Sequence, residues 1–133
     1  MFQNNNSKSI NLKVKSLLQN INITNGGLHK IAVHTIEGLE FLNKEDIVRL
    51  EAKGSYTYFH LSNKSIIVAS RNIKEYEEIL SEEIFLRVHN SHVVNLNYIK
   101  KYHKGRGGYV ILEDGKNIEV ATRRKDDFLS RFD

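Results

Sequence analysis

Short segments that alternate apolar and polar residues, separated by turn-forming residues, limit what this chain can fold into. The segment Lys30 to Ile36 (KIAVHTI) shows the alternation clearly, and Tyr56 to Leu61 (YTYFHL) is rich in the aromatic and branched residues that strands prefer. Asn, Asp, Ser, Lys and Gly residues separate the segments, which favours antiparallel strands joined by tight turns. Asp114-Gly115, between two such segments, has the composition of a hairpin turn.

Only one stretch has a clear helical period. Asn72 to Leu80 carries an apolar stripe of Ile73, Tyr76, Ile79 and Leu80, and Ser70 is the expected N-cap. A terminal helical turn is also expected over residues 125–132. The other expected strands are Leu39 to Leu42, Asp46 to Ala52, Ser65 to Ala69, Ser91 to Asn95, Tyr98 to His103, Tyr109 to Glu113 and Asn117 to Val120. The prediction is a mostly β fold with one short packing helix.

The length of 133 residues fits one domain. Residues 1–28 lack a clean period and end in Asn25-Gly26-Gly27, so we interpret them as a linker or N-terminal extension to a domain over 29–133. Whether Met1 is the natural start stays open. The net charge of +4 permits binding to nucleic acid or to an anionic membrane surface. No apolar run reaches the roughly 20 residues that span a bilayer, so membrane insertion is not expected.

Catalytic and metal sites are not indicated, and the chain is not expected to be an enzyme or to hold a cofactor. The sequence has no cysteine, which excludes thiol catalysis and disulfides. His89 and His92 are expected on opposite faces of one strand, because their spacing is odd. Ser91 lacks the surroundings of a hydrolase nucleophile. The glycines at positions 105, 107 and 108 lack the context of a phosphate-binding loop, so a flexible hairpin loop is expected there.

The C-terminal third is locally basic. Arg123-Arg124-Lys125 follows the last expected strand, where such residues can reach a phosphate or the edge of a guanine. A solvated surface run is the alternative. Asn90 can pair with adenine or simply serve a turn. No helix-turn-helix pattern accompanies these residues.

The segment Phe85 to Asn95 (FLRVHNSHVVN) closely resembles the signature F-x-R-x-H-x-S-x-x-V-N of the LytTR DNA-binding domain. Asp46 to Tyr58 (DIVRLEAKGSYTY) is similar to the strand–loop–strand core of that family, and Ile118 to Arg124 (IEVATRR) is similar to its closing element. Ala121-Thr122 stands where this element usually has a single serine-like position, which affects the register of the two arginines. The resemblance runs from about residue 30 to 132.

The resemblance implies an elongated arrangement of small antiparallel sheets with one short helix, in which loops enter successive major grooves. The DNA-binding positions it implies are Lys53, Gly54, Ser55, Asn90, His92, Arg123 and Arg124. Of these, Arg123 would read a base, Asn90 would read or position one, and Lys53 would hold a phosphate. Arg87, His89 and Ser91 either brace the Asn90 loop or touch DNA. Core positions are expected at Phe85, Val88, Val93, Val94, Leu96 and Ile99.

The resemblance also implies a partner and a setting. The expected function is sequence-specific binding of double-stranded DNA with paired direct-repeat half-sites, as the output domain of a bacterial two-component response regulator. We expect a cytoplasmic protein that is a monomer in isolation and pairs on DNA, with any receiver domain lying outside this chain. The alternative is a protein-interaction module that regulates a sensor or a membrane partner without binding DNA; exposed strand edges would support such pairing.

Overall fold

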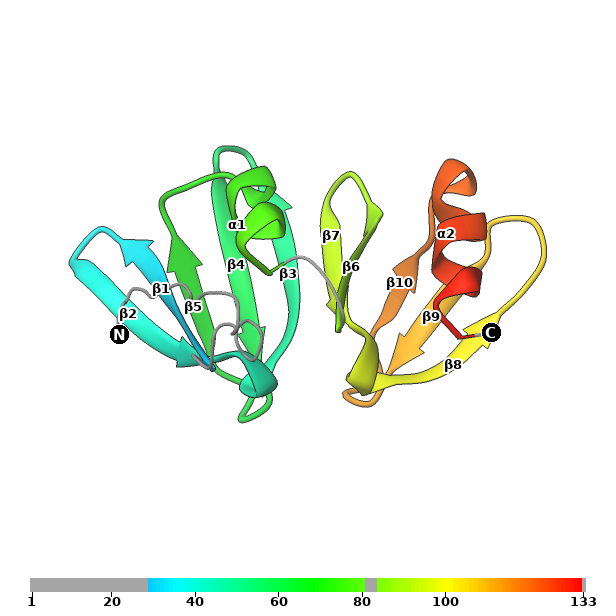
Figure 1. Ribbon diagram of the computed structural model, residues 1–133, viewed down its shortest axis with the longest axis horizontal. Helices are drawn as coiled ribbons and strands as arrows, with labels where there is room; N and C mark the ends of the chain where they lie inside the picture. Colours follow the sequence, from blue (N-terminus) through cyan, green and yellow to red (C-terminus); the bar gives the residue numbers. More distant parts are fainter. Residues whose placement is uncertain (1–28, 81–83, 133) are drawn as a thin grey trace, which may run out of the picture. The chain divides into compact units, whose positions relative to one another are not determined.

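The computed structural model describes residues 29–80 and 84–132. The linker predicted over residues 1–28 lies outside them. The described residues fall into two compact units, residues 29–32 with 41–45 and residues 33–40 with 46–80 and 84–132. In the described part of the first unit, the Lys44 amide donates to the His29 carbonyl at 2.7 Å. The second unit holds the two larger sheets, both helices and every residue predicted to contact DNA (Figure 1).

Ten strands form three antiparallel sheets in the described residues. Strands β1 (Lys30–Thr35) and β2 (Gly38–Asn43) make a two-stranded sheet, followed by the 3₁₀ turn η1 (Lys44–Asp46). The largest sheet has the order β5-β4-β3-β7-β6. Its strands are β3 (Ile47–Lys53), β4 (Tyr56–Leu61), β5 (Ile66–Ala69), β6 (Phe85–His89) and β7 (His92–Asn95). Central strand β3 pairs with its hairpin partner β4 and with the distant β7.

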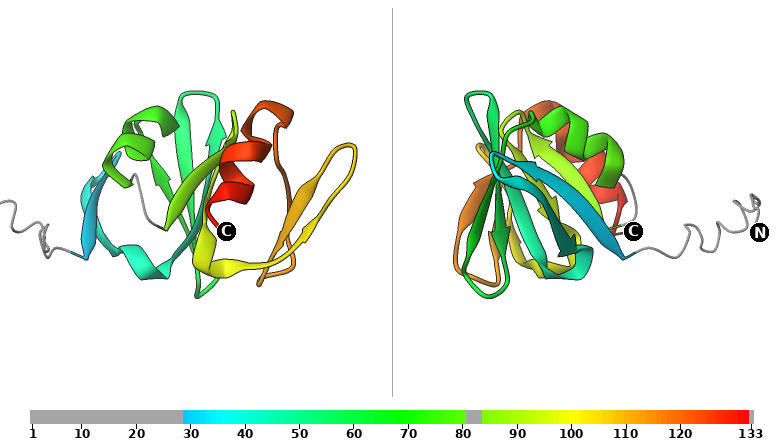
Figure 2. Two further views of the ribbon diagram at one scale, coloured as in Figure 1. Left: turned by 45° about the vertical axis from the view of Figure 1, so that its right-hand side comes forward. Right: turned by 90° about the vertical axis from the view of Figure 1, so that its left-hand side faces the viewer.

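Helix α1 (Ile73–Leu80) follows β5 and packs against β3 and β6. It buries Ile73, Tyr76 and Leu80, and the Tyr76 ring meets Phe59 edge-on with ring centroids 4.9 Å apart. The Tyr76 hydroxyl accepts a hydrogen bond from the His34 amide at 3.1 Å, so the buried tyrosine keeps a polar partner. In the edge-on view of Figure 2, α1 and the second helix lie on the same side of the sheets of the second unit.

The smaller sheet of the second unit has the order β10-β9-β8 and continues into the second helix. The elements are η2 (Leu96–Tyr98), β8 (Ile99–His103), β9 (Tyr109–Leu112), β10 (Asn117–Glu119), η3 (Thr122–Arg124) and α2 (Lys125–Ser130). One apolar cluster joins this sheet to the larger one. Its buried members are Val48, Leu86, Val88, Val94, Val110, Leu112, Ile118, Val120 and Phe128. Because burial of apolar surface stabilises by about 25 cal/mol per Å², this shared core holds the two sheets together.

Asn95, the last residue of the signature segment, ties η2 to the larger sheet. Its side chain is 1% exposed. The Nδ2 group donates to the Ile47 carbonyl at 2.9 Å, and Oδ1 accepts from the Asn97 amide at 2.9 Å. A buried amide with both ends satisfied is stabilising, whereas an apolar replacement leaves backbone groups unpaired.

The mostly β prediction is confirmed, and the expected strands and helix lie within two residues of the observed bounds, but the observed strand β6 was not predicted. The core prediction is also confirmed. Phe85, Val88, Val93 and Val94 are buried, while the side chains of residues 96 and 99 are partly buried against the shared core.

Helix α1 differs from the prediction at both ends. Ser70 is not its N-cap: its hydroxyl donates to the His34 carbonyl at 3.2 Å, whereas Asn72 Oδ1 accepts from the Glu75 amide at 3.1 Å. The helix begins at Ile73, so Asn72 is the residue directly before it and caps the amide of its third residue. Ile79 is 55% exposed and does not belong to the buried stripe.

The prediction that His89 and His92 point to opposite faces is wrong. A two-residue turn at Asn90 and Ser91 separates them, so they face each other across a hairpin as register partners. Their ring centroids are 5.4 Å apart. The odd spacing would place them on opposite faces only if the strand continued through all four residues.

Candidate nucleic-acid interface

The β3–β4 turn carries the first predicted group, Lys53, Gly54 and Ser55. Lys53 pairs with Tyr56 in the hairpin register, leaving Gly54 and Ser55 as a two-residue turn. Gly54 has φ +60°, a conformation that suits glycine in tight hairpins. All three residues are exposed. The Lys53 Nζ lies 4.9 Å from the centre of the Tyr58 ring, which holds its charge near the end of the sheet.

The β6–β7 turn carries Asn90, and Arg87 braces it from behind. The Arg87 Nη2 donates to the Asn90 carbonyl at 2.6 Å and its Nε donates to the His89 carbonyl at 3.1 Å. Its Nη1 pairs with Glu77 Oε1 on α1 at 2.6 Å. The Ser91 amide donates to His89 Nδ1 at 3.0 Å. These contacts fix the turn backbone and leave the Asn90 side chain exposed.

Hydrogen bonds bring the three predicted loops together. The Ala52 amide donates to the Ser91 carbonyl at 2.9 Å, which joins the end of β3 to the β6–β7 turn. The Arg123 Nη2 donates to Asn90 Oδ1 at 2.7 Å, which joins η3 to the same turn. Figure 1 shows the β3–β4 turn, the β6–β7 turn and the connection between β10 and α2 at the same end of the second unit.

Arg123 and Arg124 are neighbours in sequence but have different environments. Arg123 is exposed, and its guanidinium reaches the Asn90 side chain. Arg124 is half-buried, and its Nη1 donates to the Arg87 carbonyl at 3.3 Å. The Arg124 Nε is buried without a hydrogen-bond partner among the described residues. The turn at η3 therefore directs one arginine outward and the other toward the β6 backbone.

His92 lies beneath the turn rather than on its surface. Burial, followed by the positive charge of Arg49 and the neighbouring His89, lowers the pKa of His92 to about 4. The ring is therefore neutral at pH 7 and brings no charge to a phosphate. Its Nδ1 is buried without a hydrogen-bond partner among the described residues. Among the predicted positions, His92 Nδ1 and Arg124 Nε are the two side-chain atoms that are buried without a hydrogen-bond partner in the described residues.

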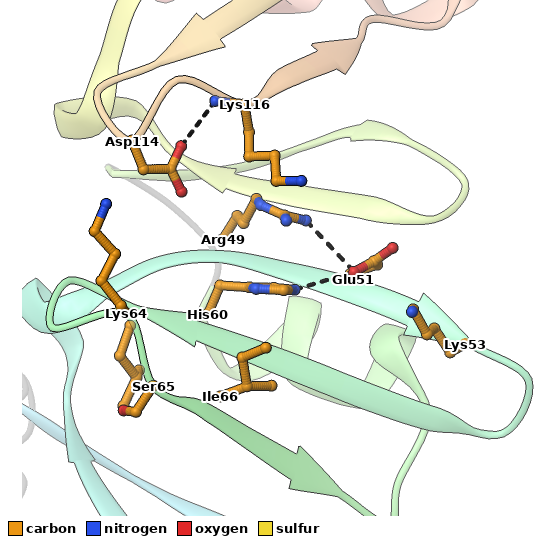
Figure 3. A pocket seen from close by; sticks show the side chains of 10 residues that line it. Arg49, Glu51, Lys53, His60, Lys64, Ser65, Ile66, Asp114 and Lys116 are labelled. Atoms are coloured by element: carbon orange, nitrogen blue, oxygen red, sulfur yellow. Dashed lines mark hydrogen bonds and ion pairs between the residues drawn. The ribbon is translucent and has the colours of Figure 1, made fainter.

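A polar groove of about 460 Å³ runs beside β3 and β4, and Figure 3 shows the side chains that line it. Glu51 lines the groove and accepts from His60 Nε2 at 3.0 Å, with Arg49 Nη1 at 3.6 Å. Burial raises the pKa of Glu51, but the hydrogen bond from His60 and the charges of Arg49 and Lys53 outweigh it, so that pKa lies below its usual value. The rest of the lining is Leu61, Lys64, Ser65, Ile66, Asp114 and Lys116.

Sequence reasoning missed the charged row on β3. Arg49, Glu51 and Lys53 stand at alternate positions, so they share one face of the strand. Arg49 is only 5% exposed. Burial is the larger cause of the lowered pKa values of His60 and His92, and the charge of Arg49 is the second cause in both. The alternation was visible in the sequence, but the pairing of β3 with β7 that places this row beside His92 was not.

Within residues 29–80 and 84–132, no three His, Asp or Glu side chains gather in a way that could hold a metal ion. In the same part of the chain, no helix is long and apolar enough to cross a membrane.

The fold and the clustered turns define a small β-sheet module whose polar groups project from turns instead of from a recognition helix. Residues 37–133 match the family model of the LytTr DNA-binding domain. The chain belongs to the LytTr DNA-binding domain family, which is a family of DNA-binding domains and not of enzymes.

Several characterised proteins are similar to this chain. The CO-responsive transcriptional regulator RcoM of Rhodospirillum rubrum is 30% identical over 100 residues, covering 74% of this chain and 42% of that protein. The sensory transduction protein LytT of Bacillus subtilis is 28% identical over 116 residues, covering 86% and 46%. The chain thus spans less than half the length of these relatives. A solved LytTr DNA-binding domain from Bacillus cereus, 22% identical, has the same fold with a TM-score of 0.68 over 80% of this chain and 98% of that one.

Proposed function

We propose that this domain binds double-stranded DNA in a sequence-specific manner, with the β3–β4 turn, the β6–β7 turn and η3 entering the major groove. The observation that carries the proposal is the hydrogen bond of 2.7 Å between Arg123 Nη2 and Asn90 Oδ1. It places the two side-chain types best suited to read guanine and adenine next to each other on exposed turns. Two adjacent base-contacting side chains on turns with a fixed backbone suit the recognition of neighbouring base pairs.

The three groups have complementary roles in this proposal. Arg123 donates its fork to the O6 and N7 atoms of a guanine, and the Asn90 amide pairs with an adenine or orients Arg123. Lys53 and the exposed Ser55 contact phosphates, which fixes the register of the domain on the duplex. Arg124 supports the β6 backbone through its bond to the Arg87 carbonyl. The buried Arg124 Nε and His92 Nδ1 take no part in DNA contacts.

The relatives support a role in transcription regulation. RcoM is named a transcriptional regulator and LytT a sensory transduction protein. We infer that residues 29–133 form the output domain of a bacterial response regulator in the cytoplasm, with residues 1–28 as a connector and the receiver domain outside this chain. The domain is a monomer in isolation and two copies pair on direct-repeat half-sites.

Selection from randomised duplexes, followed by sequencing, tests the proposed function. An enriched motif with direct repeats is expected. On that motif Arg123→Ala loses about 1–3 kcal/mol, or roughly 5- to 150-fold in affinity, and relaxes the preference at one base pair. The matched control is Arg131→Ala, which removes an exposed arginine after the C-terminal end of α2 and leaves the affinity within about twofold. If the Arg123 variant binds motif and random duplex like the parent, the assignment of the reading residue is wrong.

One observation favours the alternative of a protein-interaction module. Strand β5 is an edge of the five-stranded sheet, and its Ile66 and Val68 side chains are 48% and 43% exposed. An exposed apolar edge strand can accept a strand from a partner. Failure of the selection to enrich any motif at moderate salt would favour this alternative over DNA binding.

A further inference from the structure

Residues 100–108 comprise all of β8 after Ile99 and the connection to β9, and they form a basic arm that the three predicted loops do not include. It carries Lys100, Lys101, Lys104 and Arg106, all exposed, and no carboxylate. None of these four side chains has an ion-pair partner among the described residues. Four like charges on one arm repel one another. A polyanion that neutralises them relieves this repulsion, which favours binding.

A ring stack and a buried glycine anchor the base of the arm. The rings of His103 and Tyr109 stack at the base, with planes 3° apart and centroids 5.0 Å apart. Gly108 is buried beneath the Tyr102 hydroxyl, which lies 2.7 Å from where a Cβ would stand, so a larger residue would push the ring aside. Gly105 has φ +116°, a conformation that favours glycine. The base of the arm thus has a fixed direction.

A hydrogen bond ties the tip of the arm to the base-reading region. Lys125 Nζ donates to the Gly105 carbonyl at 3.0 Å. Lys125 is the first residue of α2 and comes directly after Arg123 and Arg124 in η3. The tip of the arm is therefore only one lysine side chain away from η3, which carries the arginine proposed to read a base. In Figure 1 it rises toward the end of the second unit that carries the other turns.

We propose that this basic arm grips DNA phosphates that flank the base pairs read by Arg123. The inference rests on the proposed function and deepens it, because it adds a fourth contact that carries no sequence information. Lys104 and Arg106 stand on either side of the anchored Gly105 and are the residues that reach the backbone. Their contacts lengthen the bound stretch of duplex on the side of η3 and strengthen binding to every sequence alike.

The test compares two double variants that each remove two positive charges from the second unit. Lys104→Ala/Arg106→Ala removes them from the arm. Lys64→Ala/Lys116→Ala removes them from the β4–β5 and β9–β10 turns, which lie at the opposite end in Figure 1. Both sets are exposed, so both variants should fold, and circular dichroism verifies this. Affinity for the selected motif and for random duplex is measured from 50 to 300 mM NaCl.

Loss of two phosphate contacts should flatten the slope of log K against log salt by about 1.8. At 150 mM salt the arm variant should bind motif and random duplex at least about tenfold more weakly, with the ratio between them unchanged. Hydroxyl-radical footprints should shorten on one flank of the motif. The control variant should keep the parent slope and footprint.

Three results would overturn the inference in distinguishable ways. If the parent binds no duplex, the proposed function and the arm both fail. If the parent binds the motif and the arm variant keeps its slope, only the arm fails. If the arm variant keeps its DNA slope but loses binding to vesicles with an anionic lipid, the arm serves a membrane surface and the DNA assignment is wrong.

Discussion

Arg87 supports the β6–β7 turn with a guanidinium whose three nitrogens each donate one hydrogen bond, to two backbone carbonyls and one carboxylate. Its side chain is 14% exposed, and its partners are the carbonyls of His89 and Asn90 and the carboxylate of Glu77. Hydrogen bonds made by charged groups contribute about 1.5–3 kcal/mol each, but bonds that share one side chain are not additive. Arg87→Ala should therefore lower the free energy of unfolding by about 2–4 kcal/mol. For a domain of this size, the same loss lowers the Tm by roughly 10–20 °C.

Two further variants separate the contributions within this network. Glu77→Gln keeps both carbonyl bonds and weakens only the ion pair with the 35% exposed Glu77, so it should cost less than about 1 kcal/mol. Arg87→Lys keeps the charge but loses the planar fork, so it should resemble the alanine variant more than the parent. Arg71→Ala is the matched control, because its pair with Glu75 is about half exposed on both sides, and it should stay within about 0.5 kcal/mol.

Urea unfolding followed by far-UV circular dichroism measures these differences, since the chain has no Trp to serve as a fluorescent probe. The m-value must stay constant across the series for the midpoints to report stability. If Arg87→Ala is no more destabilising than Arg71→Ala, the carbonyl contacts contribute nothing and the bracing of Asn90 is refuted.

Three more outcomes are expected from urea unfolding. The folded state opposes protonation of His92, because the pKa of this ring is about 4 in the fold against an ordinary value of 6.5. The contribution of the neutral ring to the free energy of unfolding is therefore complete above pH 6.5 and is lost as the pH falls toward 4. His92→Gln should flatten that part of the stability profile, and an unchanged slope would contradict the lowered pKa. Asn95→Ala should cost about 2–4 kcal/mol because it leaves two backbone groups unpaired, whereas the exposed Asn97→Ala should cost under about 0.5 kcal/mol. Arg124→Ala should destabilise the fold by about 1–2 kcal/mol, while Arg123→Ala should leave the midpoint of unfolding nearly unchanged. Equal effects of the two variants would show that Arg124 does not stabilise the fold more than Arg123 does.

Local patterns were enough to predict the helix, the core and every strand except β6. Alternation identified segments such as Tyr56–Leu61, and the stripe of Ile73, Tyr76 and Leu80 identified the helix, because one buried face imposes a period on either element. The family signature identified Asn90, which the structure places on an exposed, braced turn. These features depend on residues that are close in sequence, so a single chain reveals them.

The division of labour within the candidate site depends on three-dimensional contacts that the sequence does not show. Arg123 and Arg124 are chemically identical, and only the backbone direction at η3 turns one outward and the other toward the Arg87 carbonyl. The turn between His89 and His92 contains no glycine, so the strand pattern concealed it. The fork of Arg87 binds backbone carbonyls, which are the same in every sequence.

The pairing of β3 with β7 determines when, during folding, the three turns proposed to bind DNA come together. Glu51 and His92 are register partners, and the bond from the Ala52 amide to the Ser91 carbonyl closes a loop that includes β4, β5, α1 and β6. Closing so long a loop is entropically costly and delays folding relative to local hairpins. On a ribosome the β3–β4 hairpin can form early, but its neighbour from β7 arrives later and Arg123 later still. The grouped turns therefore exist only once nearly the whole domain has been synthesised, so a truncated chain that keeps a local hairpin lacks the assembled surface.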